Sequence, residues 1–111
     1  MTDDAPTLDE STIAALKAKH GALTLLESDA MEGVRLVVRN PKRIEYDRFH
    51  EEMNGEQATG AMLTLLRSVL VWPDATAFEA VLNRYPGAAQ EFGREISRLA
   101  GVSGRARASK L

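Results

Sequence analysis

The sequence of 111 residues contains no cysteine. Disulfide bonds and thiolate chemistry are therefore excluded, and a reducing compartment fits this composition. An excess of positive charge is also missing, because 14 Lys and Arg stand against 16 Asp and Glu and give a formal net charge of −2. A protein whose main partner is nucleic acid needs a basic face, so this balance argues against that class.

Long apolar runs are missing as well. The longest one, between residues 61 and 72, is interrupted by Thr64, Arg67 and Ser68. It is too short and too polar to span a bilayer, so we expect no membrane as a partner. The first ten residues are acidic and polar, unlike a secretory signal.

Chemistry-bearing motifs are scarce. A nucleophile needs an activating base, yet the chain has only two histidines, His20 and His50, which we interpret as structural or solvent-facing. The segment that begins at His50 lacks the second histidine of the zinc-protease motif, and no glycine-rich segment has the Gly-Lys-Ser/Thr ending of a phosphate loop. The carboxylates between residues 45 and 52 alternate with Arg48, as on a solvated helix face. We therefore expect no enzyme, no cofactor and no metal.

Hydrophobic residues make up 44% of the chain and charged residues 27%, which is typical of one globular domain with a modest core. We predict a disordered lead-in over residues 1–7, a single α+β domain over 8–101 and a flexible basic tail over 102–111.

The N-terminal half predicts a helix followed by a β-hairpin. The helix covers residues 8–20, with capping-box spacing from Thr7 to Glu10 and Gly21 as its stop. The hairpin consists of residues 22–27 and 33–39, in which apolar and polar residues alternate in the second strand. A lone hairpin is marginal in water, so one face must lie on helices or an edge must find a partner strand.

The remaining chain predicts about four helices, so the expected fold class is α+β: an N-terminal helix and β-hairpin followed by a small helical bundle. The first helix runs to Met53, with Asn40 as its cap and Pro41 at its first position. An apolar stripe over 57–72 predicts the most buried helix, which ends before Pro73. Two further helices are expected over 74–85 and 88–100.

Two features leave alternatives open. The basic cluster Arg35, Arg39, Lys42 and Arg43 is either a site for an anion or an acidic protein surface, or a set of gatekeepers that flank a strand. The helix over 57–72 is apolar nearly all round, so its apolar side chains are either enclosed in the core or partly open as a groove for an apolar partner helix.

The order of features over residues 12–100 resembles the small tail assembly chaperones of long-tailed bacteriophages. The residues that carry this resemblance are Lys17 to Gly21, Arg39 to Pro41, Glu45 to Arg48, Pro73-Asp74 and Tyr85-Pro86-Gly87. One position departs from the family pattern, since Lys42 stands after the proline where a Ser or Thr helix cap is expected.

The resemblance implies a non-enzymatic role. Such chaperones bind the long helical tape-measure protein in the host bacterial cytoplasm, keep it soluble and help to recruit tail-tube protein, and they are absent from the mature virion. The hypothetical client-contact surface, chosen from pattern, consists of Leu26, Val37, Ile44, Leu63, Val71 and Trp72, with Arg39 and Arg43 beside it.

Other classes remain open. The runner-up is a small phage structural or connector protein that assembles through the hairpin edge and stays in the particle, and self-association of the chain is compatible with either role. A small DNA-associated regulator would use the basic cluster together with Arg105, Arg107 and Lys110 of the tail, but the acidic charge balance argues against it.

Overall fold

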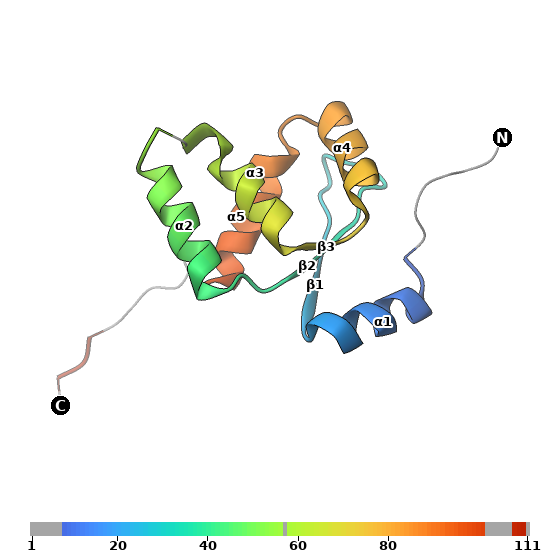
Figure 1. Ribbon diagram of the computed structural model, residues 1–111, viewed down its shortest axis with the longest axis horizontal. Coiled ribbons are helices and arrows are strands. Elements are labelled where there is room, and N and C mark those ends of the chain that lie inside the picture. The colour runs from blue at the N-terminus through green and yellow to red at the C-terminus, as the bar shows by residue number, and fades with distance from the viewer. Residues whose placement is uncertain (1–7, 57, 102–107, 111) are drawn as a thin grey trace.

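The computed structural model of the protein describes residues 8–56, 58–101 and 108–110. The chain has an α+β fold, as predicted (Figure 1). The predicted lead-in over 1–7 and most of the predicted tail over 102–111 lie outside the described residues. No helix in the described part is long and apolar enough to cross a membrane. The elements are α1 (Glu10–His20), β1 (Leu23–Leu26), β2 (Leu36–Arg39), α2 (Arg43–Met53), α3 (Ala58–Val69), β3 (Leu70–Trp72), α4 (Ala75–Arg84) and α5 (Ala88–Leu99).

Helix α1 begins two residues later than predicted. Its cap is Asp9, whose carboxylate accepts a hydrogen bond of 2.8 Å from the backbone N–H of Thr12. The predicted capping box involves Thr7, which lies outside the described residues. Gly21 ends the helix as expected, with φ +82° and an N–H bonded to the carbonyl of Lys17. No side chain of α1 is buried, and Figure 1 shows this helix apart from the other four.

The predicted hairpin is present and gains a third strand. Strands β1 and β2 pair antiparallel with Leu25 opposite Val37, and β3 joins the other edge of β2 with Trp72 opposite Val37. The prediction of one helix over 57–72 is therefore wrong at its end, because α3 stops at Val69 and the next residues add a strand. The pairing is irregular at Val71, which falls between the two registered pairs of β3.

One face of the sheet lies on the helices. Leu36 and Val38 alternate with Val37 along β2, so they point to the same face, and both are fully buried. They join a core in which α3 is central, since it packs against both α2 and α5 (Figure 1). The buried residues of this core are Leu26, Met31, Leu36, Val38, Phe49, Ala61, Leu65, Leu66, Val69, Phe78, Ala88, Phe92 and Ile96.

Helix α2 starts later than predicted and has a different cap. Asn40 is not the cap; Lys42 holds that position with extended backbone and no hydrogen bond from its side chain, which has no acceptor atom. Glu45 instead reaches back and accepts a 2.8 Å hydrogen bond from the backbone N–H of Lys42. Of the two hydrogen bonds of a capping box, the helix start thus has the one that Glu45 accepts and lacks the one that a cap side chain would accept.

The C-terminal helices follow the prediction closely. Asp74 caps α4 through a 2.9 Å hydrogen bond from the backbone N–H of Ala77. Helix α5 places Phe92, Gly93 and Ile96 against the core. The absence of a side chain at Gly93 allows close approach to α3, because a Cβ atom there would lie 2.6 Å from the sulfur of Met62.

Candidate functional site

The residues of the predicted client-contact surface do not form one surface. Leu26 and Val37 are each only 5% exposed, so neither is available to a partner in this conformation. Val37 and Trp72 are direct cross-strand partners on the sheet face turned away from the core. Leu63 packs against the core and is half-buried. Val71 is half-buried at the irregularity of β3.

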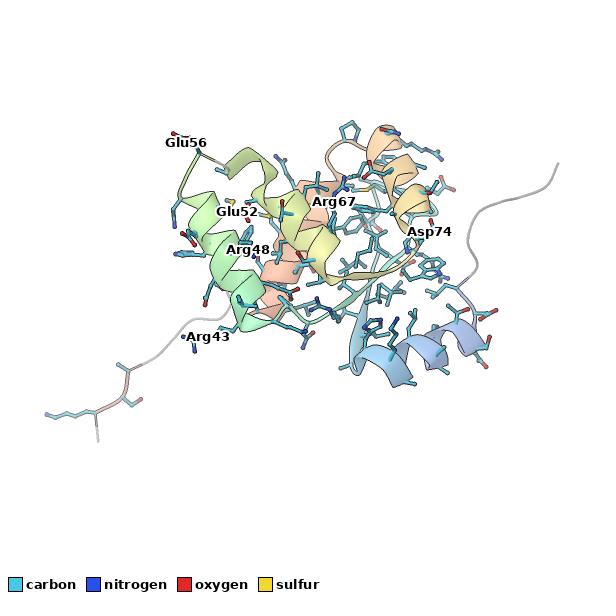
Figure 2. The ribbon with its side chains drawn as sticks, in the orientation of Figure 1. Arg43, Arg48, Glu52, Glu56, Arg67 and Asp74 are labelled. Carbon is cyan, nitrogen blue, oxygen red and sulfur yellow. The ribbon has the colours of Figure 1, made fainter. Side chains whose placement is uncertain are left out.

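At the start of α2, two of the predicted residues are open to solvent. Ile44 is 71% exposed, so its side chain is accessible. The side chain of Arg43 is 95% exposed and lies 3.7 Å from Asp47 one turn later. Figure 2 shows Arg43 at the rim of the molecule. These residues form an exposed corner of α2, separate from Val37 and Trp72.

Arg39, the central member of the basic cluster, is committed to contacts within the chain. Its guanidinium makes a bidentate pair with Glu45, with N–O distances of 2.8 and 2.6 Å, and both side chains are 19% exposed. One of its nitrogens also donates to the carbonyl of Ser68 at 2.7 Å. The Arg39–Glu45–Ser68 group, which we call the clasp, ties the end of β2 to the start of α2 and the end of α3.

The electrostatics of the clasp agree with this structural role. The hydrogen bonds from Arg39 hold the pKa of Glu45 below its usual value; burial opposes this effect and the backbone N–H of Lys42 adds to it. The same hydrogen bonds raise the pKa of Arg39. A guanidinium whose charge is already neutralised by a carboxylate attracts an anionic ligand only weakly. Since Arg35 also pairs with Glu27, at 3.4 Å, the cluster does not gather free charge at one point.

A hollow lies elsewhere, along α5. It is an open groove of about 780 Å³ with three apolar side chains from three helices: Phe49 of α2, Met62 of α3 and Phe92 of α5. Phe49 and Phe92 are buried and close its floor, whereas Met62 is half-buried and offers apolar surface to an occupant. We call this the α5 groove. None of the eight predicted contact residues lines it.

A second, smaller hollow of about 300 Å³ shares Glu91 and Arg94 with the α5 groove. It is bounded by Met31 in the segment between β1 and β2, by Tyr85 at the end of α4 and by Ala88 at the start of α5. The same segment between the strands supplies residues to both hollows. The two hollows therefore adjoin along one side of α5.

The rim of the α5 groove mixes both signs of charge. Glu95 and Arg98 pair with each other at 3.1 Å. The Oε2 atom of Glu91 and the hydroxyl of Ser97 are buried without a hydrogen-bond partner in the described part of the chain. Buried polar atoms are normally satisfied, so these two are unusual, but their burial also hides them from an occupant of the groove.

The histidines do not form a chemical centre. His50 stacks on Tyr46 with ring centroids 6.3 Å apart, and it lies 3.3 Å from the amide nitrogen of Asn54. His20 is in the last turn of α1. Within the described ranges, no group of three His, Asp or Glu side chains is placed to hold a metal ion.

The comparisons with known proteins bear on this fold. A family model, Domain of unknown function (DUF6848), matches residues 16–109. The chain belongs to this family. The matched part of the DUF6848 domain includes the clasp and every residue that lines the α5 groove.

A solved structure supports the same architecture for the DUF6848 chain. It is an uncharacterised protein from Bacillus stearothermophilus, which is 23% identical, covers 89% of this chain and 98% of its own, and superposes with a TM-score of 0.67. This likeness is one of fold. No curated protein matches the chain.

The sequence carried only a partial signal for the α5 groove. The apolar stripe of the last predicted helix contains Phe92 and Ile96, and helical spacing places Glu91, Glu95 and Arg98 beside that stripe. The opposite wall comes from Glu27 and other residues far away in the chain, which no local pattern brings to α5.

Proposed function

We propose that this DUF6848 chain is a non-catalytic binding protein whose client is an amphipathic helix, and that the client is the tape-measure protein of a long-tailed phage. The observation that carries the proposal is the α5 groove, with an apolar floor and a rim of mixed charge. The resemblance of residues 12–100 to tail assembly chaperones supplies the identity of the client. On this proposal the protein works in the host bacterial cytoplasm, helps to recruit tail-tube protein and leaves before the virion is complete.

The groove chemistry suits a helix better than a small polar ligand. An amphipathic helix lays apolar side chains at positions i, i+3, i+4 and i+7 into an apolar trough. Met62 is the accessible apolar group, and an unbranched methionine adapts to differently shaped side chains, as a chaperone for a long repetitive client requires. Glu95 and Arg98 on the rim, whose side chains are 49% and 62% exposed, offer charges of both signs to polar residues at the edge of such a helix.

Co-expression with the tape-measure protein of the same phage tests the proposal. The expected result is a clear rise in soluble tape-measure protein when the chain is present. Met62→Lys should abolish this rise, because it places a charge on the accessible wall of the groove. Met53→Lys is the matched control, since Met53 is a 40% exposed methionine of α2 that does not line the groove.

Thermal unfolding of each variant separates a binding defect from a folding defect. An unchanged yield of soluble tape-measure protein with the wild-type chain would refute the proposed function. An equal loss with both methionine variants would refute the α5 groove as the client site while leaving the role itself standing.

The second candidate function, a connector protein that stays in the particle, has one structural feature in its favour: β1 is an open edge strand through which copies could assemble. Mass spectrometry of purified virions distinguishes the two functions, because a connector is present in the particle and a chaperone is absent.

A further inference from the structure

The outer edge of β1 (Leu23–Leu26) is unprotected. In the strand order β1-β2-β3, β1 pairs only with β2, and no other hydrogen bond to its backbone is formed in the described part of the chain. Its four residues include no proline and no charge, which are the devices that normally blunt an edge strand. The opposite edge is different, since β3 is irregular at Val71 and is followed at once by Pro73.

The charges on the two sides of β1 have opposite signs. The last turn of α1, just before the strand, carries Lys17, Lys19 and His20. The segment just after the strand carries Glu27, Asp29 and Glu32. Glu27 pairs with Arg35, but Lys19, Asp29 and Glu32 form no ion pair within the described ranges. A basic and an acidic end therefore flank one open strand.

We propose that two copies of the chain pair through β1, antiparallel about a two-fold axis, so that their three-stranded sheets become one continuous sheet. Antiparallel pairing places the basic end of each copy beside the acidic end of the other, and the two-fold axis makes each contact occur twice. Parallel pairing would instead place like charges together. The charge pattern thus selects both the partner, a second copy, and the orientation.

The side chains also select a register centred on Thr24. Directly opposite residues of an antiparallel pair share a face, so Thr24 meets itself and Leu23 of each copy meets Leu25 of the other. Leu25 is 44% exposed in the single chain, and this pairing covers it. Lys19 and Asp29 lie equally far before and after Thr24, so the end of α1 in one copy comes close to Asp29 of the other.

Sedimentation equilibrium of the full-length chain tests this pairing. We expect dimers that are stronger at low ionic strength and weaker near ~1 M salt, where the screening length falls to about 3 Å. Leu25→Lys should leave a monomer, because a charge on the edge opposes strand pairing. Ile44→Lys is the matched control: it also replaces a large exposed apolar residue, on α2, and should leave the dimer unchanged.

Charge reversal provides a test that loss of folding cannot imitate. Lys19→Asp alone and Asp29→Lys alone should each raise the dimer dissociation constant about tenfold at low salt, since each turns two attractive contacts into two repulsive ones. The double variant should restore the wild-type value. A monomeric wild-type chain, a Leu25→Lys variant that still dimerises, or a double variant weaker than both single variants would each overturn the proposal. None of these outcomes depends on the α5 groove or on its client.

Discussion

The clasp offers a sharp test of the forces that hold the fold together. Glu45→Gln replaces the carboxylate with a side chain of the same size. The amide oxygen of Gln can still accept from the backbone N–H of Lys42, so the helix start keeps its contact. The variant therefore removes the charge and the bidentate pair with Arg39, and little else.

The expected loss of stability follows from the geometry of the pair. Both side chains are 19% exposed, so the pair is mostly shielded from water and is stronger than a surface ion pair. Hydrogen bonds to a charged group contribute about 1.5 to 3 kcal/mol. We expect Glu45→Gln to lower the free energy of unfolding by about 2 kcal/mol, or roughly 10 °C in Tm for a domain of this size. Urea unfolding followed by circular dichroism measures it.

The matched control is Asp47→Asn. It removes the carboxylate partner of Arg43, but this pair is 3.7 Å apart with side chains 95% and 64% exposed. Such a contact contributes little, so the expected loss is below about 0.5 kcal/mol. Equal losses for Asp47→Asn and Glu45→Gln would refute the reasoning, because burial and bidentate geometry would then make no difference.

The stability gap between wild type and Glu45→Gln should also depend on pH. The pKa of Glu45 is lowered in the folded state, so folding favours its ionised form. The stabilisation is fully present above the unfolded pKa, near 4.5, and is lost as pH falls through the lower folded pKa. The gap should therefore narrow below about pH 4.5. A gap of the same size at pH 7 and pH 3 would contradict this cause.

Two further predictions concern helix starts and helix contacts, both measured by urea unfolding. Lys42→Ser should raise the free energy of unfolding by up to ~1 kcal/mol, because a serine hydroxyl at this cap completes the capping box with Glu45. No gain in stability would mean that the helix start needs no further cap. Gly93→Ala should lower it by about 1 kcal/mol, since the new Cβ would meet the Sδ and Cβ atoms of Met62 at 2.6 and 3.1 Å. Gly60→Ala should instead raise the free energy of unfolding by up to ~1 kcal/mol, because no atom lies within 4 Å of the new Cβ. A change of the same sign for both glycines would count against steric contact as the cause.

Much of the fold follows from local signals in the sequence. Gly21 ends α1 and Asp74 caps α4 because these residues act on their own neighbours along the chain. The alternation that predicted the second strand of the hairpin agrees with β2, in which Leu36 and Val38 share the buried face.

The errors occur where distant segments decide the structure. The run that ends at Trp72 continues a helical stripe, so periodicity alone gives no reason for a strand. The second edge of β2 pairs with β3 and one face of the sheet lies on the helices, so both alternatives expected for the hairpin occur. The cap of α2 is a different, local error: Asn40 is a good cap by type, but Glu45 accepts from the backbone N–H of Lys42 and pairs with Arg39, so the helix starts after Lys42.

The candidate site was the least predictable part. Pattern analysis treated Leu63, Val71 and Trp72 as the accessible apolar group, whereas the α5 groove takes its walls from three helices and the segment after β1. Which apolar side chains stay open depends on how neighbouring elements cover one another, and the sequence does not record that directly.

Helix α1 lies apart from the core, so its local stability should be lower than that of the rest of the domain. An 11-residue helix with no buried side chain is marginal in water, so its amide protons are protected only by its own hydrogen bonds. Amides of α1 should therefore exchange with solvent deuterium through local opening, while those of the central α3 exchange only when the whole domain unfolds. Because none of its side chains is buried, α1 can unfold and re-form as a separate unit without disturbing the core.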